Sequence, residues 1–147
     1  MPTVRRARTI GAPSEDVWEI VSDPAHLPRW WPDVVRVEEA TPLAWTTVLS
    51  SPKGKTVRAD FTRMAADPPR RIAWRQEVEE SPFERILSEN TTELELAPEG
   101  DGATRVELRS VQRLRGMSRL GAFLFRRATQ RKLDEALDGL ERAVGAS

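Results

Sequence analysis

Residues 116–144 read GMSRLGAFLFRRATQRKLDEALDGLERAV, and the fold can be inferred from this proline-free stretch outward. Ser118 is suited to a helix N-cap, because its hydroxyl can accept a hydrogen bond from a free first-turn amide. The second half of the stretch repeats apolar residues at helical spacing, at Leu133, Ala136, Leu137, Leu140, Ala143 and Val144. A helix over 118–144 would be about 40 Å long, so its apolar face needs a partner as broad as a sheet.

The residues before this helix predict that sheet. Strands are expected between turns that contain Gly, Pro or Asp, at 3–10, 34–40, 43–50, 56–64, 71–78, 83–96 and 104–114. The first strand is poor in apolar residues, which is typical of a sheet edge. Two short helical segments, at 13–21 and 25–30, follow it. The order of strand, two short helices, six strands and one long helix predicts a single antiparallel α+β domain over 1–147.

The last three expected strands agree on which face is buried. Even-numbered positions are mostly apolar or neutral, as at Ile72, Trp74 and Val106, whereas odd-numbered positions are mostly charged, as at Glu93 and Arg109. Because successive side chains of a strand point to opposite faces, one face is expected to meet the long helix and the other to meet water. The charged face mixes glutamate with arginine, which favours cross-strand ion pairs.

Composition excludes several classes of function. A chain of 147 residues with 39% hydrophobic and 31% charged residues is typical of one globular domain. There is no cysteine and only one histidine, His26, so we expect no metal, no cofactor and no Ser-His-Asp triad. A net charge of zero argues against nucleic-acid binding. No segment approaches the ~18 apolar residues of a membrane span, so we expect no stable membrane insertion and a cytoplasmic location.

Five short segments carry a family resemblance: APSEDVW at 12–18, VSDP at 21–24, LPRWWP at 27–32, VVRVE at 34–38 and LDEAL at 133–137. With the order of elements, they resemble the START-like (SRPBCC) superfamily, which includes the birch-pollen allergen fold and the polyketide cyclase/dehydrase and lipid-transport proteins. The resemblance implies a helix-grip fold, in which a curved antiparallel sheet of six to seven strands wraps around the long C-terminal helix. It also implies a cavity between them for a hydrophobic or amphipathic small molecule. It supplies no catalytic residue, because no cyclase motif is present.

Aromatic side chains are the first candidates for the wall of such a cavity, namely Trp30, Trp31, Trp45, Phe61 and Trp74. Two adjacent tryptophans on a short segment cannot both face the core. We therefore expect one of Trp30 and Trp31 to be buried and the other to line or gate the entrance. Core packing is the alternative role for every one of these aromatic residues, although a residue in the wall of a central cavity also contacts the ligand.

Neutral polar residues share the expected inward face, at Gln76, Ser88, Asn90, Thr92, Ser110 and Gln112, among apolar residues such as Leu108. A dry core rarely holds so many, because each unsatisfied group costs roughly 1–3 kcal/mol. They either satisfy one another and a few buried waters, or they bind carbonyl and hydroxyl groups of a ligand, which is our prediction. Phe123 and Arg127 of the long helix complete the expected site. The ligand is expected to be uncharged and oxygenated unless Arg127 or Arg131 turns inward.

Residues 113–132 carry seven cations and no acid, at Arg113, Arg115, Arg119, Arg126, Arg127, Arg131 and Lys132. Apolar residues alternate with them, at Met117, Leu120, Phe123, Leu124 and Phe125. A solvated helix face explains this pattern. An anionic ligand head group, an anionic membrane surface during lipid loading and a partner protein are the sharper alternatives.

Three functions are compatible with these features. The first is binding of a small hydrophobic molecule such as a polyketide, a lipid or an isoprenoid, by a monomer or a homodimer. The second is an aromatase/cyclase-type enzyme that uses the same cavity to position a reactive chain. The third is a protein-interaction module that uses Trp30 and Trp31 or the Arg-rich helix. Binding without catalysis is the hypothesis that we prefer.

Overall fold

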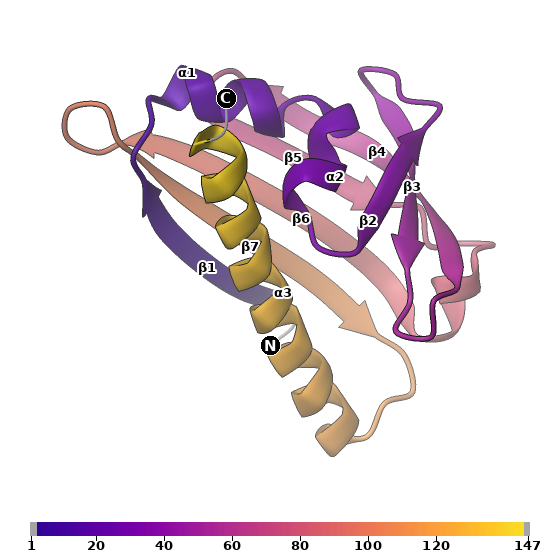
Figure 1. Cartoon of the computed structure of the whole chain (residues 1–147). Coiled ribbons are helices and arrows are strands. Elements are labelled where there is room, and N and C mark those ends of the chain that lie inside the picture. Colours follow the sequence, from indigo (N-terminus) through magenta and orange to yellow (C-terminus); the bar gives the residue numbers. More distant parts are fainter. Residues whose placement is uncertain (1–2, 146–147) are drawn as a thin grey trace.

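The computed structural model describes residues 3–145, in which seven antiparallel strands form one sheet and a long helix crosses its face (Figure 1). The elements are β1 (Thr3–Ile10), α1 (Ser14–Val21), the 3-10 helix η1 (Pro24–His26), α2 (Leu27–Trp30), β2 (Val34–Glu38), β3 (Ala44–Ser50), β4 (Thr56–Asp67), β5 (Arg71–Gln76), the 3-10 helix η2 (Pro82–Arg85), β6 (Leu87–Pro98), β7 (Thr104–Leu114) and α3 (Arg119–Gly145). Residues 1–2 and 146–147, which the expected domain 1–147 includes, lie outside the described residues.

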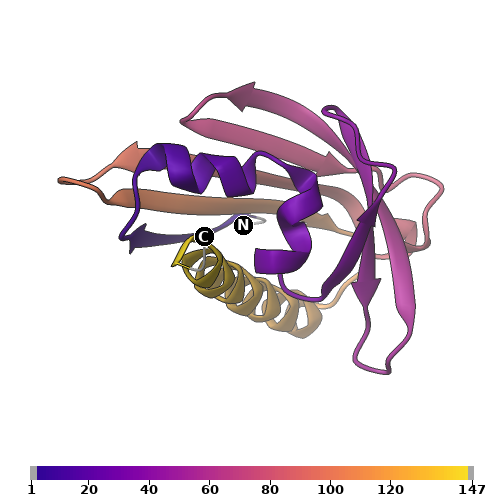
Figure 2. The same cartoon turned by 45° about the horizontal axis from the view of Figure 1, so that its top comes forward.

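The strand order across the sheet is β1-β7-β6-β5-β4-β3-β2, and each neighbouring pair is antiparallel. The apolar-poor β1 lies at the edge, as expected. Figure 2 shows the sheet curling, with α1, α2 and α3 on its inner side. The predicted α+β helix-grip fold is confirmed. Among residues 3–145, none of the helices has both the length and the apolar composition that a membrane span requires.

Helix α3 begins and packs as its sequence indicates. The Ser118 hydroxyl accepts a 3.0 Å hydrogen bond from the backbone N–H of Gly121, which confirms the N-cap. The predicted apolar stripe is buried at Leu133, Ala136, Leu137, Leu140 and Ala143. This stripe covers only the C-terminal half of the helix, so the first turns of α3 are held by fewer core contacts.

Ion pairs fix α3 against the edge strand β1. Arg6 lies 3.3 Å from Asp134, measured from Nε to Oδ1, and Arg8 pairs with Asp138 one helical turn further along. The side chains of Asp134 and Asp138 are about half exposed, so each pair adds little stability on its own. Their spacing of four residues matches the helix pitch, and they therefore set the direction in which α3 crosses β1.

Helix α2 touches α3 at a point where only glycine fits. A Cβ atom on Gly139 would lie 2.3 Å from the carbonyl oxygen of Trp30 and 2.9 Å from its Cα. The two backbones are therefore in direct contact, and the indole of Trp30 is 3% exposed in the core. This close approach holds α2 over the inner face of the sheet, next to the cavity described below.

Three register shifts interrupt the alternation of side chains within strands, and the first lies in β2 between Val34 and Arg36. The register of β6 shifts between Leu87 and Glu89, so Leu87 points inward at 3% exposure and Ser88 is exposed. The register of β4 shifts directly after Arg63, which faces inward like Phe61 two residues earlier, and Met64 is 53% exposed. The strict even-odd alternation that we predicted for β6 is therefore wrong at its start.

The inward-facing Arg63 connects the sheet to α1. Its guanidinium group donates a hydrogen bond to the backbone carbonyl oxygen of Ser22, directly after the last residue of α1. A cation is favourable there because free carbonyl groups at a helix C-terminus carry partial negative charge. Burial lowers the pKa of Arg63, although the nearby Asp23 carboxylate opposes this shift.

The segment between β5 and β6 differs from our prediction of a strand over 83–96. Residues 82–85 form η2, whose N-cap is Ser81, with its hydroxyl 3.2 Å from the backbone N–H of Phe83. Pro82 occupies the first helical position, where its missing N–H is not needed. The Ser-Pro pair therefore starts a helical turn, and β6 begins only at Leu87.

The outer face of the sheet carries the predicted cross-strand ion pairs. Glu93 of β6 lies between Arg71 of β5 and Arg109 of β7, and it accepts a 2.9 Å hydrogen bond from Arg71. The hydrogen bond from Arg71, reinforced by that from Arg109, lowers the pKa of Glu93 from 4.5 to about 2, although partial burial opposes the shift. The same contact with Glu93 raises the pKa of Arg71.

Candidate ligand-binding cavity

A cavity of about 250 Å³ lies between the inner face of the sheet, α2 and the middle of α3. Its apolar wall combines side chains from β2, β3, β4, β5, η2 and the helices, and its polar patch comes mainly from β5, β6 and β7. The curl of the sheet creates this space, because a straight helix cannot contact a curved surface along its whole length. The volume is just below the roughly 300–1,000 Å³ of most small-molecule pockets.

Four aromatic side chains form one continuous wall. Trp45 and Phe61 are directly paired across β3 and β4, and their rings are stacked with centroids 6.0 Å apart and an interplanar angle of 11°. Trp74 meets Trp45 edge to face at 6.3 Å and meets Trp31 at 5.9 Å. All four line the cavity. Such a wall offers both ring faces and ring edges to an apolar or aromatic ligand.

The two adjacent tryptophans have different positions. Trp30 is buried against α3 and is not in the wall, so our assignment of Trp30 to the site is not supported by its position. Trp31 is partly exposed and lines the cavity at the end of α2. The rings meet edge to face with centroids 5.4 Å apart. Trp30 therefore anchors α2 and so positions Trp31.

The polar residues of the sheet form a patch beside the aromatic wall on the same inner face, at Gln76, Asn90, Thr92, Ser110 and Gln112. Part of this patch is satisfied internally. The Asn90 side-chain amide donates a 2.9 Å hydrogen bond to Gln76 Oε1, and the Thr129 hydroxyl lies 2.8 Å from Gln112 Oε1. The first bond fixes the Gln76 carboxamide. Some polar atoms of the patch therefore satisfy one another, whereas others remain available to a ligand.

Three buried polar atoms of wall residues have no hydrogen-bond partner among residues 3–145. They are Gln76 Nε2, the Thr47 hydroxyl oxygen and Trp45 Nε1. Gln76, Thr47 and Trp45 are 5%, 3% and 4% exposed, so bulk water does not compensate them. Two of these atoms can only donate and the third can donate or accept. A molecule that brings acceptor oxygens into the cavity can pair with these atoms after a small shift of their side chains, because the atoms themselves are closed off from the cavity.

Four other expected site residues also lie away from the wall. Ser88 is exposed because of the bulge in β6, and Leu108 is fully buried in the core. Phe123 is 54% exposed and lies outside the cavity, and the exposed Arg127 has its guanidinium carbon 5.9 Å from the centre of the Phe123 ring. Phe123 and Arg127 would face the cavity only if α3 were rotated about its own axis by about half a turn.

Several wall residues were not predicted from the sequence. From α3 these are Phe125, Thr129, Lys132 and Leu133, and from the rest of the chain Leu27, Val34, Thr47, Leu49, Phe83, Ile86 and Leu87. The α3 set was detectable, because 125, 129 and 133 continue the buried stripe toward the N-terminus at a spacing of four. Phe83 and Ile86 were hidden because we read their segment as a strand.

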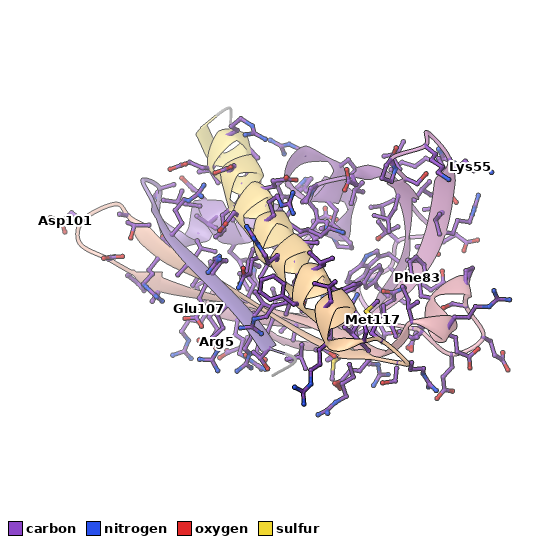
Figure 3. All side chains as sticks on the ribbon, turned by 90° about the horizontal axis from the view of Figure 1, so that it is seen from below. Arg5, Lys55, Phe83, Asp101, Glu107 and Met117 are labelled. Atoms are coloured by element: carbon purple, nitrogen blue, oxygen red, sulfur yellow. The ribbon has the colours of Figure 1, made fainter. Side chains whose placement is uncertain are left out.

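The wall reaches solvent near the start of α3. Figure 3 looks at this end of the molecule, where Met117 marks the loop before α3 and Phe83 marks η2. Ile86 is 40% exposed and Lys132 is exposed, although both line the cavity. Among the lining residues, Lys132 alone has an ionisable acid or base group. Within residues 3–145, no three His, Asp or Glu side chains are grouped to hold a metal ion.

A family model described as polyketide cyclase / dehydrase and lipid transport matches residues 1–145. A search of curated proteins found no match. A solved structure from Thermus thermophilus is 25% identical, covers 99% of this chain and 98% of its own, and has a TM-score of 0.76.

Two further structures share the fold at lower identity. A START superfamily protein from Mycobacterium smegmatis is 13% identical with a TM-score of 0.80, over 98% of this chain and 97% of its own. The Zhui aromatase/cyclase from Streptomyces sp. R1128 is 20% identical with a TM-score of 0.78, over 97% of this chain and 93% of its own.

Proposed function

Because this chain belongs to the polyketide cyclase/dehydrase and lipid-transport family, we propose that it binds a compact aromatic molecule with neutral oxygen groups, of the polyketide type, in the cavity between the sheet and α3. One observation carries this proposal. Polar atoms of Gln76, Thr47 and Trp45 are buried without partners among the described residues, beside a wall of aromatic rings. An unpaired buried group costs about 1–3 kcal/mol, and a ligand oxygen that pairs with it removes that penalty.

The geometry suggests how such a ligand is oriented. Its rings pack against Trp31, Trp45 and Trp74, and a carbonyl oxygen accepts a hydrogen bond from Gln76 Nε2. Asn90 holds the Gln76 carboxamide in place through its 2.9 Å hydrogen bond. Any acidic group on the ligand points to the mouth, because Lys132 provides a positive charge there. Arg127 and Arg131 do not line the cavity, so the interior favours a neutral part of the ligand.

Binding without chemical conversion is the better-supported role. General acid-base catalysis needs an ionisable group placed at the reacting atoms. Lys132 is the single such group in the wall, and it lies at the solvent-exposed mouth. The polar groups deeper in the cavity are amides and hydroxyls, which position a ligand more readily than they transfer protons. Turnover of a poly-β-ketone chain by the purified protein would instead indicate a cyclase.

A fluorescence titration tests the proposal. Three of the five tryptophans line the cavity, so 1,8-dihydroxyanthraquinone is expected to quench their fluorescence saturably. Gln76→Leu removes the buried donor and should raise the Kd at least about fivefold, which corresponds to about 1 kcal/mol.

Ser88→Leu is the matched control, because it places the same side chain at an exposed site on β6 and should leave the Kd unchanged. Circular dichroism verifies that both variants are folded. Linear, non-saturable quenching, or equal Kd values for Gln76→Leu and the wild type, would contradict the proposal.

A further inference from the structure

The N-terminal third of α3 exposes large apolar side chains. Leu120, Phe123 and Leu124 are 67%, 54% and 56% exposed, and Met117 in the preceding loop is 37% exposed. Their spacing of three and four residues places Leu120, Phe123 and Leu124 on one face of the helix. Figure 1 shows α1 and α2 beside the other end of α3, so neither covers this face. We call the four residues the apolar ridge.

Positive charge surrounds the apolar ridge. Arg119, Arg127 and Arg131 follow the same helical face, and residues 113–132 contain no acid although the whole chain has zero net charge. Arg113 pairs with Glu89 at the end of β7. By contrast, Arg119, Arg127 and Arg131 lie within ion-pair distance of no carboxylate in the described part of the chain. The cations are therefore segregated at one end of the molecule and are available to an external anion.

We propose that the apolar ridge and these arginines dock the protein on an anionic lipid bilayer. Helices that combine Leu and Phe with Arg insert their apolar side chains at the headgroup boundary while the arginines contact lipid phosphates. A bilayer also accepts four separate protruding side chains without a complementary shape. A protein partner would need fitted pockets for them. Each arginine near an anionic leaflet adds roughly fivefold to the binding constant, from about 1 kcal/mol per charge.

The docking face adjoins the ligand cavity. A surface groove of about 490 Å³ lies between β7 and the start of α3, and Gln112 and Phe125 line both the groove and the cavity. Phe123 and Arg119 line the groove as well. Docking through the apolar ridge thus brings the bilayer to the side of the molecule where Phe125 separates the cavity from the groove. This position suits the exchange of an apolar ligand between membrane and cavity.

Vesicle co-sedimentation tests the docking without any cavity ligand, so its result is independent of the proposed function. The protein is expected to sediment with vesicles of an equal mixture of phosphatidylcholine and phosphatidylglycerol, and far less with phosphatidylcholine alone. Binding should weaken as salt is raised, because exposed charges are screened. Phe123→Ser/Leu124→Ser should lower the partition constant at least about tenfold, and Arg127→Gln/Arg131→Gln should lower it about tenfold or more.

Matched controls change the same properties elsewhere. Leu43→Ser/Met64→Ser removes two exposed apolar side chains of the β3–β4 region. Arg70→Gln/Arg75→Gln removes two exposed charges, one before β5 and one on β5. Both controls should bind vesicles like the wild type. Equal binding to both vesicle types would overturn the proposal, and so would equal losses of binding in the control variants. Sedimentation velocity provides a third test: if the wild type is a homodimer and Phe123→Ser/Leu124→Ser is a monomer, the apolar ridge serves self-association and the proposal is wrong.

Discussion

Replacing Gly139 with alanine is expected to destabilise the protein, although alanine is the better helix former by about 1 kcal/mol. The new Cβ would lie 2.3 Å from the Trp30 carbonyl oxygen, and real Cβ contacts are essentially never shorter than 3.0 Å. The opposing atoms belong to backbone, so no side chain can rotate away. Helix α2 must therefore move outward, and Trp30 would lose part of its packing in the core.

The magnitude follows from these two opposing terms. Overpacking in a well-packed interior costs about 1–3 kcal/mol and occasionally more, and contact between two backbones belongs at the upper end of that range. After subtraction of the helix-propensity gain, the net loss in the free energy of unfolding is about 2 kcal/mol. For a chain of this length, that loss lowers Tm by about 4–8 °C. Urea unfolding followed by circular dichroism measures the loss in the free energy of unfolding.

The same helix supplies the control. A Cβ on Gly121 would meet only side-chain atoms, at 3.3 Å from the Ser118 hydroxyl and 3.7 Å from Met117. Gly121→Ala is therefore expected to be neutral or to stabilise by up to about 1 kcal/mol. If Gly139→Ala matched the wild type or exceeded it, α2 would not contact α3 at Gly139, and the assignment of Trp31 to the cavity wall would lose its basis.

Two further predictions concern ionisation and buried polar groups. Glu93 has a lower pKa in the folded chain, so it stabilises the fold above pH 4.5 and this contribution disappears as the pH falls toward about 2. Glu93→Gln should lower the free energy of unfolding by roughly 2 kcal/mol at neutral pH, and its stability should change less with pH below 4.5 than that of the wild type. Glu95→Gln changes an exposed carboxylate on the same strand and should have neither effect. Thr47→Val should be neutral or stabilise by up to about 1 kcal/mol, because it removes a buried hydroxyl without a partner among the described residues. Thr46→Val should instead destabilise by about 1 kcal/mol, because Thr46 donates a 2.6 Å hydrogen bond to Asp60; equal effects of the two threonine changes in urea unfolding would contradict this reasoning.

The site residues that could be identified from sequence are those governed by strand alternation. Gln76, Asn90 and Ser110 lie on the inner face because each belongs to a regularly alternating part of its strand, which in β6 starts after the bulge. Trp45 and Phe61 follow the same rule on β3 and β4. The rule fails at Ser88, where one bulged residue reverses the direction of the side chain. A bulge depends on how two strands pair, so the residues around Ser88 did not by themselves predict it.

Local sequence patterns were enough to establish the α+β class, the order of the elements, the helix start at Ser118 and the buried stripe of α3, because capping and periodicity depend on residues close together in the chain. The flank of α3 that faces the cavity, where Lys132 and Thr129 replace the expected Phe123 and Arg127, became known only from the three-dimensional arrangement. The same is true of the finding that Trp31 rather than Trp30 reaches the wall. Both outcomes depend on contacts between distant residues, above all the contact of Gly139 with Trp30 and the pairing of α3 with Arg6 and Arg8 of β1, which set the rotation and position of helices relative to the sheet.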